Sequence, residues 1–242
     1  MKLSTDSIFL LDQLVQSAMV ADLQKMIVEK GSIRGIDAKN SVVLVTTDNV
    51  PDLGGKQAAI NRISELSARL SLVKAQGSLD IDATVSTTNA DDISLLDLSS
   101  GKTKAQFRCA AVEAMKGVPK SIKDNLVWEL KIDGKLLPIL TQGVSAMGAD
   151  RMTIASKDGK LVSIECVDSN KDVFTTEVED APVWIGAGAP ASSFCLQYPA
   201  KTLLALLKES VKMANPVIIK LGEGGILSLK MNGFDFFVLP LQ

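Results

Sequence analysis

The order in which helical and strand patterns follow one another limits the possible folds of this chain most strongly. Apolar residues recur at helical spacing in four segments, residues 5–18, 59–74, 134–147 and 199–214. The stretches between them alternate apolar and polar residues, as half-buried strands do. The series helix, strands, helix, strands therefore occurs twice, before residue 111 and after residue 125, in copies of about 115 residues with little residue identity. This layout predicts an α+β protein of two similar domains.

Turn residues and a segment without periodicity mark the boundaries between these elements. The pairs Asp158-Gly159 and Asn232-Gly233 predict hairpin turns, because both residue types tolerate the backbone conformations that tight turns require. Residues 112–124 contain Gly117 and Pro119 and show no clear period, which is typical of an interdomain connector. We therefore expect an N-terminal domain at residues 1–111, a connector at 112–124 and a C-terminal domain at 125–242.

The absence of histidine from the 242 residues restricts the chemistry that is open to this chain. It removes Ser-His-Asp and Cys-His catalysis and the usual nitrogen ligands of zinc. An enzyme could still use Asp, Glu, Lys or Cys, but we expect neither an enzyme nor a metal or cofactor. The cysteines, Cys109, Cys166 and Cys195, are too far apart for a CxxC site and favour a reduced compartment. The N-terminus lacks a signal pattern and no stretch is apolar enough to span a bilayer, so we expect a cytoplasmic protein without a membrane partner.

Two glycine-rich stretches and two acidic groups have weak functional alternatives. "GAGAPA" (186–191) fits G-x-G-x-x-A, but the next residues alternate like a strand where a dinucleotide site needs a helix. "LGGKQ" (53–57) lacks the upstream glycine spacing and the Ser/Thr of a phosphate loop, so both are expected to be loops. Paired carboxylates can serve acid/base or metal chemistry, but these lie in a turn and along a strand face, which favours solvated or interface groups. They are Asp91, Asp92, Glu177, Glu179 and Asp180.

Basic residues form rows on the predicted helices although the formal net charge is −2. Lys201, Lys208 and Lys212 are seven and then four residues apart, so they fall within roughly 40° of one another around a helix. Arg62 and Arg69 are also seven apart. Lys135 and Gln142 repeat the spacing on the third helix. Exposed helix faces are usually charged, but a similar row on three of four helices favours a shared function.

With these rows, the layout resembles DNA polymerase sliding clamps of the eukaryotic, archaeal and T4-like phage type. The opening "MKLSTDSIFLLDQL" is similar to phage clamps, which favours a bacteriophage origin. Residues 31–47 and 209–240 resemble a first-domain segment and the C-terminus of such clamps. The resemblance implies two domains, each with two helices packed on a curved antiparallel sheet, and three chains that close into a ring around duplex DNA. It implies double-stranded DNA bound without sequence preference, a replicative DNA polymerase and a clamp loader as partners, and no catalytic residue.

The resemblance also assigns candidate residues to three surfaces. The DNA-facing residues would be Arg62, Arg69, Lys74, Lys135, Lys201, Lys208 and Lys212. A pocket for partner peptides would be formed by Ile36, Asn40, Val43, Val112, Met115, Val118, Pro119, Val238, Leu239, Pro240 and Leu241. The subunit interface would pair residues 102–110 of one chain with 173–179 of the next. It would involve Lys102, Lys104, Phe107, Arg108, Phe174, Glu177 and Glu179, with Asp172 and Asp180 beside them. Phe236 and Val238 would be buried, and residues 239–241 partly exposed.

The first helix departs from the clamp pattern. Clamps of this type usually carry Lys or Arg on the inner face of that helix, whereas this chain offers Asp6, Asp12, Gln13 and Gln16. Two other interpretations stay open. The chain could be a β-rich structural or assembly oligomer of a virus, with the lysines merely solvated. A small enzyme that uses Lys and Asp or Glu is the third interpretation, and no residue constellation supports it.

Overall fold

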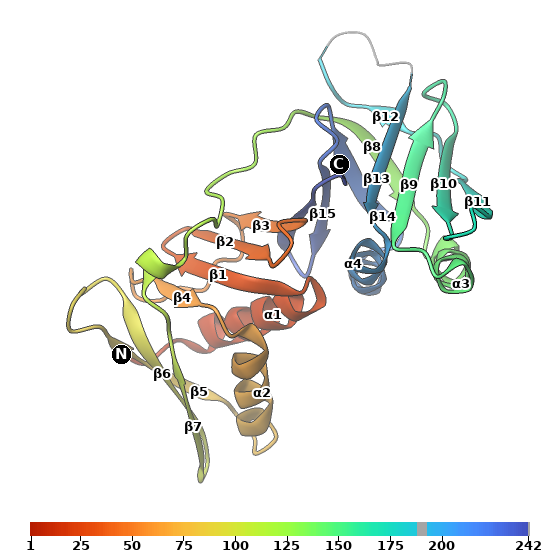
Figure 1. Ribbon diagram of the computed structural model, residues 1–242. Helices are drawn as coiled ribbons and strands as arrows, with labels where there is room; N and C mark the ends of the chain where they lie inside the picture. The colour runs from red at the N-terminus through yellow and green to blue at the C-terminus, as the bar shows by residue number, and fades with distance from the viewer. Residues whose placement is uncertain (188–192, 242) are drawn as a thin grey trace. The chain divides into compact units, whose positions relative to one another are not determined.

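A computed structural model describes residues 1–187 and 193–241 (Figure 1). The chain divides into two compact units. The first comprises Met1–Ile122 and Asn232–Phe234, and the second comprises Lys123–Met231 and Asp235–Gln242. Each is described by itself.

The first unit contains two helices and two antiparallel sheets. Its sheets have the strand orders β3-β2-β1-β4 and β5-β6-β7. Both helices contact β1, and α2 also packs on β6 and β7, so the core lies between the helix pair and the sheets (Figure 1). The elements are α1 (Thr5–Val20), β1 (Leu23–Glu29), β2 (Ser32–Asp37), β3 (Val42–Thr46), β4 (Ala58–Ile60), α2 (Ile63–Lys74), β5 (Asp80–Val85), β6 (Ile93–Ser100), β7 (Thr103–Arg108) and the 3-10 turn η1 (Val112–Ala114).

The second unit repeats this plan. Helices α3 and α4 pack against each other and on strands of two sheets, with the orders β12-β8-β14-β15-β16 and β11-β10-β9-β13. The elements are β8 (Leu126–Ile132), α3 (Leu136–Met147), β9 (Arg151–Ser156), β10 (Val162–Val167), β11 (Val173–Val178), β12 (Val183–Trp184), β13 (Phe194–Pro199), α4 (Ala200–Met213), β14 (Val217–Gly222), β15 (Leu227–Met231) and β16 (Phe234–Val238). The predicted α+β class, with two helices on antiparallel strands in each half, is confirmed.

Local chemistry explains most element boundaries. Ser4 accepts a hydrogen bond from the backbone N–H of Ser7 and so caps the start of α1. Gly148 adopts φ +57° and ends α3 in a left-handed cap. Asn232 and Gly233 both have positive φ and join β15 to β16, as the predicted two-residue turn requires.

One prediction of secondary structure is wrong, and one short strand was missed. The second helix begins at Ile63, not at residue 59, because Ala58–Ile60 pairs with β1 as strand β4. Ile60 is fully buried, but in this strand and not on a helix face. Strand β12 is only two residues long and was not predicted. Short apolar segments are compatible with helix or strand, and the neighbouring strand decides between them.

Candidate functional site

Helix α4 presents its three lysines to solvent. Lys201, Lys208 and Lys212 are all exposed, whereas the opposite side of the helix is buried through Leu203, Leu204, Leu206, Leu207 and Ser210. The Lys201–Asp150 pair is 3.4 Å long, and its side chains are 78% and 85% exposed. Lys212 pairs with Glu209 at 2.6 Å, and Lys208 has no ion pair within residues 1–187 and 193–241. Exposed pairs contribute about 0–1 kcal/mol, so these lysines can exchange their partners for phosphate groups.

Lys135 lies next to α3 and not on its face. It occupies the position before the first helical residue and is exposed, as is Gln142. Its backbone N–H donates to the Asp133 carboxylate at 2.9 Å. The predicted row of Lys135 and Gln142 is therefore only partly formed, although Lys135 remains an accessible cation.

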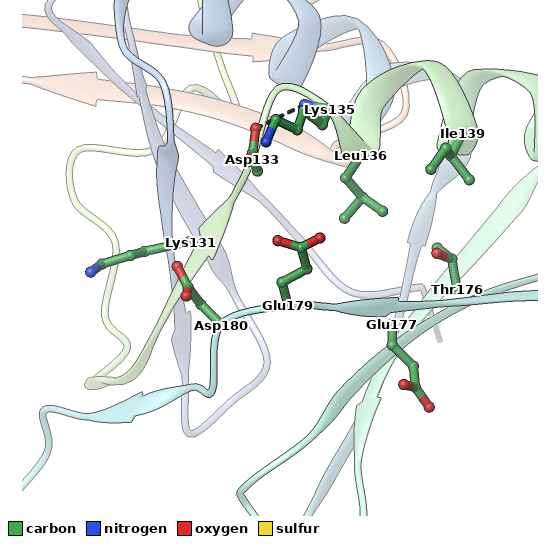
Figure 2. A pocket seen from close by; sticks show the side chains of 9 residues that line it. All are labelled: Lys131, Asp133, Lys135, Leu136, Ile139, Thr176, Glu177, Glu179 and Asp180. Atoms are coloured by element: carbon green, nitrogen blue, oxygen red, sulfur yellow. Dashed lines mark hydrogen bonds between the residues drawn. The ribbon is translucent and has the colours of Figure 1, made fainter.

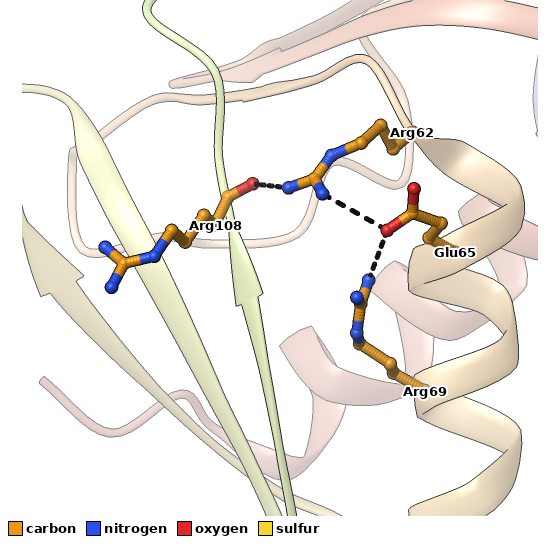
Figure 3. Close-up of polar contacts among 4 residues, drawn as sticks. All are labelled: Arg62, Glu65, Arg69 and Arg108. Atoms are coloured by element: carbon orange, nitrogen blue, oxygen red, sulfur yellow. Dashed lines mark hydrogen bonds and ion pairs between the residues drawn. The ribbon is translucent and has the colours of Figure 1, made fainter.

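Arg62, the residue before α2, and Arg69 of α2 are engaged inside their own unit. Figure 3 shows Arg62 and Arg69 converging on Glu65, with N–O distances of 3.1 and 2.9 Å. Arg62 also donates to the backbone carbonyl of Arg108 at 3.0 Å. Both guanidinium groups lie over the ring of Phe107, 5.2 and 5.6 Å from its centre. These contacts favour a structural role, because a move to a phosphate would break several of them at once.

The acidic first helix has a structural explanation. Asp12 of α1 forms an ion pair with Lys74 of α2, and its other carboxylate oxygen is buried without a hydrogen-bond partner in the described part of the chain. Gln16 donates to Ser67 of α2 at 3.3 Å. Asp12 and Gln16 of α1 therefore bind α2, and Lys74 is held by a carboxylate.

Strands β7 and β11 each lie at the edge of a sheet. On β7, the exposed side chains Lys104, Gln106 and Arg108 alternate with inward ones. Phe107 is 0% exposed, which corrects its assignment to a subunit contact, because α2 covers it. Lys102 is exposed in the turn before β7.

The edge of β11 is acidic at its end. Glu177 is exposed, and Phe174 is half-buried against Gly143 of α3. β11 ends at Val178, so Glu179 does not continue the face of Glu177 as the sequence pattern predicts. Phe174 therefore supports the edge from behind, and Glu177 remains the carboxylate on the outward face.

A cavity of about 340 Å³ lies where β11 ends beside the start of α3 (Figure 2). Figure 2 shows Glu179 pointing toward Lys135 and Leu136, whereas Glu177 points the other way. The lining residues are Lys131, Asp133, Lys135, Leu136, Ile139, Thr176, Glu177, Glu179 and Asp180. Four carboxylates and two lysines line it, so the lining is negative on balance and does not favour an anion.

The residues assigned to a peptide pocket fall on both units. In the first unit, Ile36, Val43, Met115 and Val118 are buried, whereas Asn40 is exposed and Val112 and Pro119 are half-buried. The buried side chains cannot contact a ligand in this conformation. In the second unit, the predictions of a buried Phe236 and Val238 and a partly exposed tail are confirmed. The backbone N–H of Leu241 donates to the carbonyl of Gln197 at 2.8 Å.

The structure adds no support for a functional role of the glycine-rich and acidic motifs. "GAGAPA" includes residues 188–191, which lie outside the described residues, and the segment after it is strand β13 instead of a helix. After Gly54 and Gly55 the chain continues into strand β4, whereas a phosphate loop would be followed by a helix. Within residues 1–187 and 193–241, no group of three or more acidic or cysteine side chains could hold a metal ion. In the same residues, no helix is long and apolar enough to cross a membrane.

Three lysines of the predicted connector, residues 112–124, were not singled out by sequence patterns. Lys116, Lys120 and Lys123 are exposed and spaced four and three residues apart in "KGVPKSIK". That spacing, in a segment with few apolar residues, was the signal that could have identified them.

Comparison with solved structures identifies the fold over the whole chain. No protein-family model matches the sequence, and no curated protein matches it. PCNA of A. fulgidus, solved with the C-terminal region of FEN-1 bound, is 14% identical with a TM-score of 0.64, and the match covers 100% of this chain and 97% of that one. Proliferating Cellular Nuclear Antigen from Entamoeba histolytica is 18% identical with a TM-score of 0.62, over 100% and 98%. PCNA from Thermococcus kodakaraensis is 14% identical with a TM-score of 0.63, over 99% of both chains. This chain therefore has the fold of these proteins from end to end.

Proposed function

We propose that this chain is a sliding clamp, which encircles duplex DNA and tethers a replicative DNA polymerase. The observation that carries the proposal is the exposed lysine row of α4 on a chain whose whole length matches PCNA structures. The net charge is −2, so a local basic row does not reflect an overall basic surface. An inner basic surface and an acidic remainder would attract DNA to one place only.

Such a clamp needs no catalytic group. A closed ring holds DNA by topology, and its lysines contact phosphates, which carry no sequence information. Lys201, Lys208, Lys212 and Lys135 are the cations that are available for this contact. Arg62, Arg69 and Lys74 are held by Glu65 and Asp12, so they would contribute less. Few, exchangeable contacts favour sliding, because each step along the DNA must break and remake them.

The ring would be a homotrimer formed through the edges of β7 and β11. An unpaired sheet edge is a template for another strand, and head-to-tail pairing of two different edges can close a ring. Two other edge strands already bond to segments of their own chain: Met1–Leu3 bonds to β5, and Leu241 bonds to β13. Lys102, Lys104 and Arg108 beside one edge would oppose Glu177, with Glu179 at its end, on the next chain.

Partners would dock through short peptides near the connector and the C-terminal tail. PCNA of A. fulgidus was solved with the C-terminal region of FEN-1 bound to it, and a polymerase and a clamp loader would bind this chain through peptides of their own. Half-buried Val112 and Pro119 offer apolar contact in the first unit, and half-buried Leu239, Pro240 and Leu241 offer it separately in the second. A cytoplasmic location fits this role.

The direct test removes the lysine row. Lys201→Ala, Lys208→Ala and Lys212→Ala together leave the buried face of α4 unchanged, so folding and the trimer should persist. The slope of log affinity for DNA against log salt should shrink by up to about 2.7, since each lost phosphate contact removes about 0.9. Processive synthesis on primed circular DNA should fall in parallel.

The matched control replaces three exposed lysines of the second unit that lie in loops, Lys157, Lys160 and Lys171, with Ala. It makes the same change in net charge. Equal salt slopes and equal product lengths for the two triple variants would contradict the assignment of α4 to DNA.

A further inference from the structure

The connector of this chain carries unpaired positive charge. Lys116, Lys120 and Lys123 are exposed, and none of them forms an ion pair within residues 1–187 and 193–241. Gly117 and Pro119 lie between Lys116 and Lys120, and residues 116–123 do not form a helix. Each ammonium group is therefore available to a ligand that lies along the connector.

The acidic residues of the same segment do not balance these lysines. The Asp124 carboxylate accepts hydrogen bonds from the backbone N–H groups of Gly224 and Ile226, at 2.9 and 3.1 Å. It lies so close to Gly222 that a Cβ there would be 2.0 Å from one of its oxygens. Asp124 is thus committed to the turn between β14 and β15, and Glu113 is left as the exposed connector carboxylate.

A further cation braces the connector from the first unit. The Lys25 ammonium of β1 donates to the backbone carbonyl of Lys116 at 3.3 Å. This contact places a second positive charge beside Lys116 and fixes the backbone there. Met115 and Val118, on either side, are buried and anchor the segment, while Val112 and Pro119 remain half-buried.

We propose that this connector selects partner peptides whose apolar anchors are flanked by acidic residues. The inference rests on the proposed function, because it concerns the peptide site of the clamp. Apolar contact with Val112 and Pro119 would hold the anchors, and Lys116 and Lys120 would attract aspartate or glutamate beside them. The protein as a whole has a net charge of −2 and would favour basic peptides, so a preference for acidic ones must arise locally.

The test titrates full-length protein with two synthetic peptides by calorimetry. Both carry the same apolar anchors; one is flanked by glutamates and the other by lysines. Two or three exposed ion pairs should make the acidic peptide bind roughly tenfold more tightly at low salt. The preference should shrink as added salt shortens the screening length.

Charge-reversal variants locate the effect. Lys116→Glu with Lys120→Glu should reverse the preference, and Lys116→Gln with Lys120→Gln should abolish it without introducing repulsion. Lys157→Glu with Lys160→Glu, in the exposed β9–β10 loop, makes the same change in charge and should leave the preference intact.

Each other outcome counts against the inference in a distinguishable way. Equal affinities, or tighter binding of the basic peptide, would overturn it and leave the clamp function standing. Reversal by the loop variant would assign the preference to the overall charge. Failure of both peptides to bind would overturn it together with the proposed peptide site, while the DNA role is tested separately through α4.

Discussion

Reversing the charge of Arg108 tests how the proposed ring assembles. The side chain of Arg108 is exposed, and Figure 3 shows it pointing away from Arg62, Glu65 and Arg69. Arg62 binds the backbone carbonyl of Arg108, which every residue possesses. Arg108→Glu therefore removes no internal contact through its side chain, and an effect on assembly would come from the surface.

The expected size follows from the number of interfaces. Replacing an attractive exposed pair with a repulsive one changes the interaction by about 0.4–2 kcal/mol, twice the value of such a pair. A closed trimer repeats the contact three times, so ring formation should weaken by about 1–6 kcal/mol. A value near 3 kcal/mol corresponds to roughly a hundredfold change in the assembly constant.

The assay is molar mass in solution by light scattering over a dilution series. Arg108→Glu should shift the trimer-to-monomer transition to higher protein concentration, and adding Glu177→Lys should partly restore it. Lys157→Glu, in the β9–β10 loop, is the control for net charge. An unchanged transition for Arg108→Glu, or no recovery in the double variant, would refute pairing between β7 and β11.

Four further predictions concern individual side chains of the two units. Asp12→Ser releases Lys74, so the salt slope of DNA binding should steepen by up to about 0.9, measured against Asp6→Ser; an unchanged slope would keep Lys74 away from DNA. Gly143→Ala places a Cβ 2.3 Å from the Phe174 ring and should lower the free energy of unfolding by about 1–3 kcal/mol in urea titrations, whereas Ser145→Ala on the exposed side of α3 should not. Exposed Cys195 should react with maleimide well before Cys109, since burial raises the pKa of Cys109 from 9.0 to about 12. The folded Cys109 thiol keeps its proton between these values while the unfolded one loses it, so stability should fall as pH rises through that window, and less so in Cys109→Ala.

The basic rows show how far sequence patterns reach toward a site. The period of α4 correctly placed Lys201, Lys208 and Lys212 outside and the leucines inside, because burial of an apolar stripe orients a helix. The same spacing of Arg62 and Arg69 did not predict the contacts that hold these two side chains. Glu65 forms ion pairs with both Arg62 and Arg69. The ring of Phe107, which lies on a strand about 40 residues later, contacts the arginines, and helical periodicity cannot predict a contact with so distant a residue.

Which strands lie at a sheet edge depended even more on residues that are distant in sequence. Alternation identified residues 102–110 and 173–179 as strands, but not which of their sides meets another strand. Only the pairing of β6 with β7 and of β10 with β11 left these two strands at sheet edges. The short strand β4 formed where a helix was predicted, since β1 supplied hydrogen-bond partners that local propensity does not contain.

The sequence by itself determined the doubled order of helices and strands, the exposed lysines of α4 and the absence of histidine chemistry. These properties depend on residue type and on the spacing of near neighbours along the chain. The tertiary structure decided that Asp12 forms an ion pair with Lys74 and that Phe107 is buried in the core. It also decided that Asp124 accepts a hydrogen bond from a turn about 100 residues away, which leaves the connector basic. Each of these results joins residues far apart in sequence, whose interaction exists only once the backbone has brought them together.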